Sequence, residues 1–221
     1  MLHDDATLDA VTTHDYHDLR ALANTIWRHH YSAIISVAQI DYMLAGRFSD
    51  AALREYAQAG DRWLDLLRLS GTPVGYCGYE FADQYGDERL AAMKLGQLDV
   101  LESHRGMGLG RFMLSHVESR ARDLGRRVLF LQVNKQNTVA IGFYAAAGFT
   151  IAREAVFDIG SGFVMDDYVM EKLLNLPPAP APLSAPALHS PHPTANTHPP
   201  DQPKGTDRRP TAVTLRSCRP Q

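Results

Sequence analysis

The stretch of sequence that decides the fold runs from an apolar segment into three closely spaced glycines: Leu98-Asp99-Val100-Leu101-Glu102-Ser103-His104-Arg105-Gly106-Met107-Gly108-Leu109-Gly110-Arg111. Residues 89–101 have the pattern of a long strand, and apolar residues at helical spacing predict a helix over 108–124. Glycines let the backbone approach a ligand closely, and the first N–H groups of a helix have no partner within the helix. The stretch therefore predicts a strand–loop–helix unit that binds phosphate groups.

Two well-known phosphate-binding loops do not fit this stretch. No Gly-Lys-Ser or Gly-Lys-Thr follows the glycines, as a Walker loop requires. The Rossmann fingerprint is excluded as well, because no strand of a first βαβ unit ends in an acid about 20 residues further on. A simple tight turn without a ligand remains the alternative interpretation of the three glycines.

Helical and strand-like patterns alternate on both sides of this unit. Upstream, the expected elements are a strand over 6–12, helices over 15–30, 36–46 and 49–59, and strands over 62–69 and 74–81 joined through Ser70-Gly71-Thr72-Pro73. Downstream of a polar loop over 83–88 and of the unit itself, we expect a strand over 128–133, a helix over 137–147 and strands over 149–158 and 163–172. This order predicts an α/β fold with a mixed sheet of about seven strands flanked by helices.

The composition limits the classes of protein to consider. The chain has 221 residues, a formal net charge of -3 and two cysteines, Cys77 and Cys218, which are too few for a disulfide framework. The first residues are acidic rather than a secretory signal, and no apolar run reaches the ~18 residues of a membrane-spanning helix. We therefore expect a cytoplasmic protein without membrane contact.

The last fifth of the chain differs from the rest. Twelve of the 13 prolines lie in residues 177–221, and no aromatic residue follows Tyr168. Residues 1–176 carry 17 Lys and Arg against 23 Asp and Glu, whereas the remainder carries five against two. We predict one folded domain over residues 1–175 and a Pro-rich disordered tail over 176–221. Its basic residues are too dispersed to favour nucleic acid as a partner over a solvated extension.

A second motif lies downstream: Val133-Asn134-Lys135-Gln136-Asn137-Thr138-Val139-Ala140-Ile141-Gly142-Phe143-Tyr144-Ala145-Ala146-Ala147-Gly148-Phe149. Together with Arg105-x-x-Gly108-x-Gly110, it resembles the GNAT-type N-acetyltransferase superfamily. The hallmarks are an Asn that opens a helix, then Ala-Ile-x-Phe-Tyr, then Gly-Phe. The resemblance covers about residues 6–173 and implies a single GNAT-like domain that uses acetyl-coenzyme A as its co-substrate.

The resemblance also implies which residues bind the co-substrate. The backbone of Leu98 and Val100 would hydrogen-bond the pantetheine arm, and Asn137 would hold that arm from the following helix. Arg105 belongs to the loop, although it is also compatible with a plain exposed charge. The backbone N–H groups of the glycine stretch would surround the pyrophosphate; they belong to Gly106, Met107, Gly108, Leu109, Gly110 and Arg111.

Acetyl transfer to an amine needs an oxyanion donor, an acid for the leaving thiolate and a base. By resemblance, the Val100 N–H is the oxyanion donor and Tyr144 donates a proton to the sulfur. Tyr144 could instead be only a core aromatic residue, and Asn137 only a helix N-cap. The predicted strand lacks the glutamate that many family members carry, which leaves Asp99, Glu80 or an ordered water as candidate bases.

The acceptor and the assembly remain open from sequence alone. A primary amine of a small molecule or of a protein fits the chemistry, and an acidic rim of Glu154, Asp158, Asp166 and Asp167 favours a small cation such as a polyamine. The alternative function is a non-catalytic acyl-coenzyme A sensor on the same scaffold. A homodimer is one assembly compatible with the chain, and the histidines and cysteines do not predict a metal site.

Overall fold

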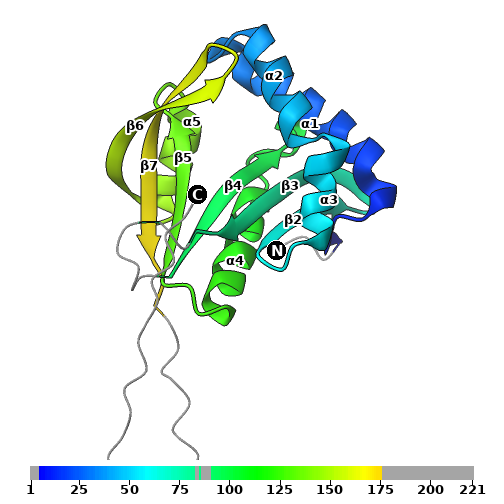
Figure 1. Cartoon of the computed structure of the whole chain (residues 1–221). Helices are drawn as coiled ribbons and strands as arrows, with labels where there is room; N and C mark the ends of the chain where they lie inside the picture. Colours follow the sequence, from blue (N-terminus) through cyan, green and yellow to red (C-terminus); the bar gives the residue numbers. More distant parts are fainter. Residues whose placement is uncertain (1–4, 83–84, 86–90, 176–221) are drawn as a thin grey trace, which may run out of the picture. The chain divides into compact units, whose positions relative to one another are not determined.

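The structure of the chain is a computed structural model that describes residues 5–82, 85 and 91–175. All of them belong to one compact unit, Met1–Ala179. Figure 1 shows a twisted sheet with helices on both faces. The strands are β1 Ala6–Ala10, β2 Arg62–Leu69, β3 Thr72–Phe81, β4 Ala92–Val100, β5 Val128–Asn134, β6 Thr150–Gly160 and β7 Phe163–Leu173. The α-helices are α1 Tyr16–His30, α2 Val37–Arg47, α3 Asp50–Gln58, α4 Leu109–Asp123 and α5 Thr138–Ala146.

The seven strands form one mixed sheet in the order β1-β2-β3-β4-β5-β7-β6. The β4–β5 pair is parallel, and every other pair is antiparallel. Helix α4 supplies the crossover that a parallel pair requires. The predicted α/β architecture and the seven-stranded mixed sheet are confirmed.

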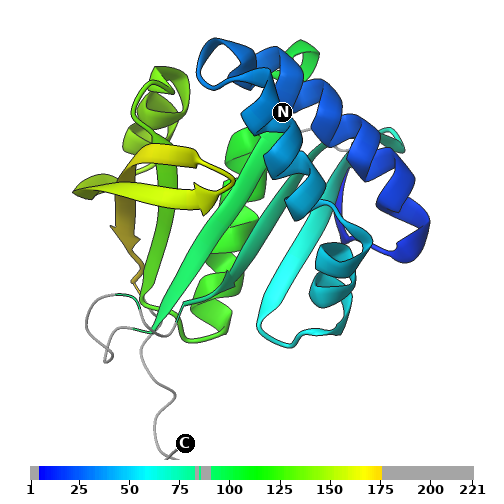
Figure 2. The same ribbon diagram turned by 45° about the horizontal axis from the view of Figure 1, so that its top comes forward.

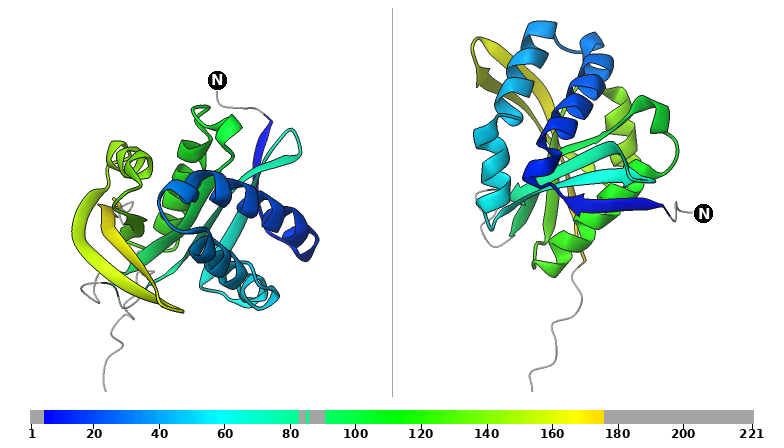
Figure 3. Two further views of the ribbon diagram at one scale, coloured as in Figure 1. Left: turned by 90° about the horizontal axis from the view of Figure 1, so that it is seen from above. Right: turned by 90° about the vertical axis from the view of Figure 1, so that its right-hand side faces the viewer.

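The two faces of the sheet are covered by different helices (Figure 3). On one face, α1, α2 and α3 pack over β2 and β3 around a fully buried group that includes Leu19, Ile40 and Leu66. On the other face, α4 and α5 pack over β3, β4 and β5 around residues such as Met113 and Leu129. Burial of these apolar side chains on both faces is the main stabilising contribution to the fold.

The observed element boundaries follow the expected ones within a few residues, with one informative difference at the first hairpin. The predicted turn of four residues is wrong, because Thr72 and Pro73 already belong to β3. Ser70 and Gly71 both adopt positive φ, 49° and 80°, as a two-residue turn between antiparallel strands requires. The long strand predicted over 89–101 is described only from Ala92 to Val100.

Some expectations lie outside the described residues. The polar loop predicted over 83–88 contains only residue 85 among those that the structure describes, and the predicted tail over 176–221 contains none. These two expectations stay predictions.

The tip of the β6–β7 hairpin contacts helix α2 (Figure 2). The Tyr42 hydroxyl donates a hydrogen bond to the Ile159 carbonyl at 2.7 Å, and the Gln39 side-chain amide donates to the Val164 carbonyl at 3.0 Å. Gly160 is required here, because a Cβ at this position would lie 2.5 Å from the Tyr42 oxygen. These contacts bring α2 and β7 to the same end of the molecule, beside the opening between β4 and β5.

Candidate active site

The candidate site lies where the two parallel strands separate. β4 and β5 are paired from Ala92–Val128 to Leu95–Leu131, and the pairing then stops. Beyond that point β5 continues to Asn134, where it is still paired with β7. A cavity of about 490 Å³ occupies the gap, lined on one side by residues 96–100 and on the other by 132–134. Because β4 remains paired with β3 up to Val100, its other backbone edge faces this cavity. An extended ligand can therefore bond to β4 as an added strand.

The glycine stretch forms one wall of the same cavity. Gly106 and Gly108 adopt positive φ, 75° and 84°, and Gly108 is the N-cap residue of α4. No heavy atom lies within 4 Å of the position where a Cβ would stand at either glycine, so the space above the loop is open. The free N–H groups and the positive end of the α4 dipole point into that space. The loop has the shape and polarity of a phosphate site.

The structure does not bring every predicted loop residue into the cavity. Arg105, Gly106, Gly108, Leu109, Gly110 and Arg111 line it, and so do Leu98 and Val100. Met107 is 40% exposed and lies outside the lining. The Arg111 guanidinium donates a hydrogen bond to the Ala146 carbonyl at 3.2 Å and lies above the Phe143 ring. These two contacts join α4 to α5 beside the cavity.

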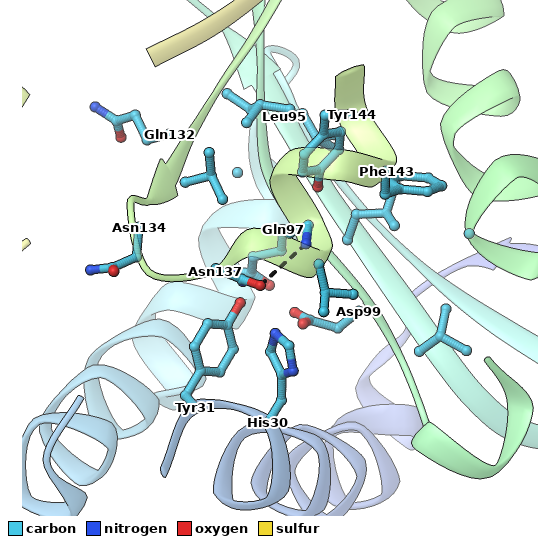
Figure 4. A pocket seen from close by; sticks show the side chains of 18 of the residues that line it. His30, Tyr31, Leu95, Gln97, Asp99, Gln132, Asn134, Asn137, Phe143 and Tyr144 are labelled. Atoms are coloured by element: carbon cyan, nitrogen blue, oxygen red, sulfur yellow. Dashed lines mark hydrogen bonds between the residues drawn. The ribbon is translucent and has the colours of Figure 1, made fainter. Parts of the chain in front are cut away.

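Helix α5 contributes two predicted residues from the opposite wall. Asn137 is its N-cap, and the side-chain oxygen accepts a hydrogen bond from the Ala140 N–H at 3.2 Å. Tyr144 is 8% exposed and packs against Phe143 and Phe149, while its hydroxyl points into the cavity (Figure 4). Burial, reinforced by the nearby Asp99, raises the pKa of Tyr144 well above its usual value. The phenol therefore stays protonated at neutral pH, as a proton donor must.

Asp99 lies in the lining and is 8% exposed. Burial raises the pKa of this carboxyl, while hydrogen bonding to Tyr76 and Trp27 acts in the opposite direction. The Trp27 indole also donates to the Tyr76 hydroxyl at 2.9 Å. Asp99 is thus held in a network that ties β4 to β3 and α1.

Glu80 lies on β3 outside the cavity lining. Its carboxylate is half-buried and lies 4.0 Å from the Arg62 guanidinium, a distant ion pair on the α3 side. Of the two carboxylates that the sequence suggested as bases, the structure brings only Asp99 into the cavity.

The far end of the cavity combines the final hairpin, whose acids the sequence suggested as an acceptor rim, with elements that the sequence did not connect with the site. His30 comes from α1, Met43 and Arg47 come from α2, and Tyr31 and Ile35 come from the segment between these two helices. Lys94 comes from the early part of β4, and the final hairpin contributes Phe157, Ile159, Met165 and Asp167. Burial lowers the pKa of His30, and the neighbouring Arg105 has the same effect. Burial likewise raises the pKa of Tyr31. This end of the cavity, named the acceptor end because we propose that the acceptor enters there, is mainly apolar with a few charged groups.

Asp167 is the most unusual group at the acceptor end. It is 4% exposed, and its Oδ1 atom has no hydrogen-bond partner among the described residues. Burial raises its pKa to about 6, with Asp166 acting in the same direction. The sequence carried a signal for this residue: Met165, Asp167 and Val169 alternate along one strand face, and a carboxylate between apolar residues on a buried face rarely serves packing.

The other acids of the predicted rim have partners on the protein. Lys135 forms ion pairs with Glu154 at 2.8 Å and Asp166 at 2.6 Å. Asp158 accepts a hydrogen bond from the Gly160 N–H at 2.8 Å. Among the four acids, only Asp167 lines the cavity.

Three further features of the structure bear on the predicted function class. Over residues 5–82, 85 and 91–175, no group of three or more His, Cys, Asp or Glu could hold a metal ion. In the same part of the chain, no helix is long and apolar enough to cross a membrane. Cys77 is fully buried in the sheet, and burial raises the pKa of its thiol. The thiol is therefore unreactive and contributes to core packing.

A strand pair that separates beside a glycine loop, a helix N-terminus and a buried tyrosine defines an acyltransferase architecture. The sequence profile of the Acetyltransferase (GNAT) family matches residues 18–149. An uncharacterised N-acetyltransferase of Mycobacterium bovis is 32% identical over 126 residues, which span 57% of this chain and 76% of that protein. The chain belongs to the GNAT acetyltransferase family, and the predicted acyltransferase class and acetyl-coenzyme A co-substrate are confirmed.

Solved structures with the same fold include two with informative ligands. PaiA N-acetyltransferase from Thermoplasma acidophilum, in complex with coenzyme A, has a TM-score of 0.62 at 19% identity and covers 76% of this chain and 98% of its own. Naa50 from Arabidopsis thaliana, in complex with a bisubstrate analogue, has a TM-score of 0.54 at 21% identity, with coverages of 76% and 98%. At these identities the likeness establishes the fold.

Proposed function

We propose that this protein transfers the acetyl group of acetyl-coenzyme A to a primary amine that enters the cavity beside α2 and the β6–β7 hairpin. The observation that carries the proposal is that one cavity is lined by the open edge of β4, the Gly106–Gly108 loop and the Tyr144 side chain. Each supplies one requirement of the reaction: positioning of the arm, binding of the phosphates and protonation of the thiolate.

The residues present fit the co-substrate. In this proposal, the backbone of Leu98 and Val100 bonds the pantetheine arm, and the first N–H groups of α4 bind the pyrophosphate. The Val100 N–H stabilises the oxyanion that develops on the acetyl carbonyl. Asn137 keeps the start of α5 against the arm, because its side chain already caps that helix. Tyr144 donates the proton that the departing sulfur needs, because the raised pKa of this phenol keeps it protonated until the thiolate forms beside it.

The charges in and around the cavity bear on the class of acceptor. A small cation such as a polyamine was suggested by the four rim acids, but Lys135 neutralises two of them. The cavity also contains Arg47 and Lys94, which disfavour a multiply charged cation. We therefore propose a small amine with an apolar portion that packs on Met43 and Met165, ahead of a polyamine or a protein N-terminus.

An acceptor screen tests the reaction directly. Thiol release from acetyl-coenzyme A is measured with spermidine, kanamycin, L-phenylalanine and a pentapeptide with a free N-terminus, each at low and high salt. Turnover with any amine supports the enzyme. Saturable binding of acetyl-coenzyme A in calorimetry without turnover would support the alternative function, a non-catalytic sensor. A rate of spermidine acetylation that falls steeply with increasing salt concentration would favour a polyamine as the acceptor.

The assembly and the location of the protein stay predictions. Sedimentation at several protein concentrations tests the homodimer, and fractionation of the source cells tests the cytoplasmic location.

A further inference from the structure

The cavity lining contains two carboxylates, Asp99 and Asp167, and the proposed reaction does not yet use either of them. Asp167 projects from β7 into the same cavity as Val100 and Tyr144. Its Oδ1 atom is left without a hydrogen-bond partner among the described residues, although the side chain is 4% exposed. Burying an unpaired carboxylate makes folding less favourable. Such a group persists when the bound state gives it a partner that the free protein lacks.

We propose that Asp167 accepts the proton that the acceptor ammonium must lose before it attacks the acetyl group. The inference rests on the proposed function. It assigns the base to a residue of the acceptor end, in place of Asp99 or Glu80.

The other carboxylates near the site are less suited to this role. Asp99 is hydrogen-bonded within the network of Tyr76 and Trp27. Glu80 is outside the lining and lies near Arg62. Asp166, the chain neighbour of Asp167, alternates to the other face of β7 and pairs with Lys135. Among the carboxylates that the structure describes, only Asp167 combines burial, a free acceptor atom and a place at the acceptor end.

The charged groups around Asp167 come from four elements. Asp166 on β7 raises its pKa along with burial, and Arg47 on α2, Lys94 on β4 and Lys135 after β5 lower it. The resulting pKa of about 6 leaves the carboxylate mostly ionised at neutral pH. It is nevertheless basic enough to share the proton of an ammonium whose nitrogen is beginning to form a bond.

Two residues, Asp167 and Tyr144, accept and donate the protons that move during the reaction. The ammonium gives one proton to the Asp167 carboxylate and becomes a neutral amine, whose nitrogen then forms the C–N bond while the carbonyl becomes an oxyanion. When the C–S bond breaks, Tyr144 gives its proton to the thiolate, and the resulting phenolate takes the second proton from nitrogen. Asp167 finally releases its proton to solvent, so the products are the N-acetyl amine, coenzyme A and one proton.

The test compares the pH dependence of kcat/KM in three variants, using the screened amine with the highest turnover and saturating acetyl-coenzyme A. Asp167→Asn should lower kcat/KM at pH 7 by ~100-fold or more and remove the acid limb near pH 6. The deficit should shrink as pH rises, because the amine then deprotonates without help. A purely structural role would lower activity equally at every pH.

Two neighbouring substitutions should move the acid limb in opposite directions. Asp166→Asn removes a like charge, so the limb should shift to lower pH with the plateau rate preserved. Lys94→Met removes a positive charge, so the limb should shift to higher pH. Carboxyl ¹³C NMR of the free parent protein should show one aspartate titrating near 6 that is missing in Asp167→Asn.

The outcomes separate the two proposals. If no amine in the screen is acetylated, the proposed function fails and this inference with it. If acetylation occurs and Asp167→Asn retains an unchanged acid limb, the proposed function stands and the assignment of Asp167 is overturned.

Discussion

The donor end and the acceptor end of the cavity are built in different ways. At the donor end, where we propose that acetyl-coenzyme A binds, β4, the glycine loop and α4 follow one another without interruption in the chain, and the proposed binding groups are mostly backbone N–H groups. At the acceptor end, side chains from α1, α2, β4, β6 and β7 converge from distant parts of the sequence. One end is therefore encoded locally, whereas the other exists only after the sheet has formed.

This difference predicts that the two ends tolerate substitutions differently. Backbone groups on a glycine loop depend on φ values that other residues rarely adopt, so the donor end is sensitive to a single substitution. Side chains at the acceptor end can be exchanged without altering the loop. The two ends should accordingly separate in experiments: donor-end variants should affect the affinity for acetyl-coenzyme A, and acceptor-end variants the KM for the amine.

The largest effect is expected at the donor end. Gly108→Asp forces a side chain onto a residue with φ of 84° and places a negative charge beside the phosphates. The Kd for acetyl-coenzyme A should rise by ~100-fold or more, because juxtaposed like charges cost several kcal/mol. Calorimetry on the folded variant measures this.

The matched control is Gly125→Asp. Gly125 also has positive φ, 69°, and open space at its Cβ position, but it follows the opposite end of α4. The control should suffer similar backbone strain while it keeps the parent's Kd. Equal loss of binding in both variants would show that strain in α4, rather than the loop, controls affinity.

The second effect concerns the junction of the two ends. Tyr144→Phe removes one hydroxyl from a buried ring, so kcat should fall ~10- to 1000-fold while the Kd for acetyl-coenzyme A stays within twofold. Tyr85→Phe is the control, because the Tyr85 hydroxyl donates to Glu171 at 2.8 Å outside the cavity lining. Unchanged turnover in Tyr144→Phe would show that Tyr144 contributes only to packing and not to catalysis.

The sequence predicted the donor end far better than the acceptor end. Gly106, Gly108, Asn137 and Tyr144 lie in contiguous motifs, and the structure brings all four to the cavity. Arg47 and Lys94 gave no comparable signal, because a lone charge at a helix end or within a strand usually faces solvent. Only the separation of β4 from β5 and the contact of α2 with the β6–β7 hairpin place them together.

The third effect is a change in stability that separates Asp167 from ordinary acids. Its native pKa of about 6 exceeds the usual 3.8, so the native state binds the proton more tightly than the unfolded chain. This group therefore makes the parent less stable as pH rises from 3.8 to 6. The Asp167→Asn variant has no carboxyl at this position and does not lose stability in this way. The free energy of unfolding of the variant minus that of the parent should therefore be about 2 kcal/mol larger at pH 7.5 than at pH 4.5.

Urea unfolding at the two pH values measures this difference, with Asp166→Asn as the control. Asp166 is exposed and paired with Lys135, so its substitution should change the unfolding free energy much less. A parent and an Asp167→Asn variant with parallel pH dependence would contradict a raised pKa in the native state.

The smallest effect is expected from Arg47, and its direction reports the charge of the acceptor. Arg47 ends α2 and lines the cavity, with its guanidinium 5.9 Å from the centre of the Trp27 ring. Arg47→Gln removes a positive charge that repels cations, so the KM for spermidine should fall by roughly two- to fivefold, while the KM for an amine that carries a carboxylate should rise by a similar factor. The Kd for acetyl-coenzyme A should stay unchanged, in contrast to Gly108→Asp. Arg54→Gln, on the exposed side of α3, should alter neither KM. If Arg47→Gln instead changed only the Kd for acetyl-coenzyme A, Arg47 would belong to the donor end, and the division of the cavity into two ends would fail.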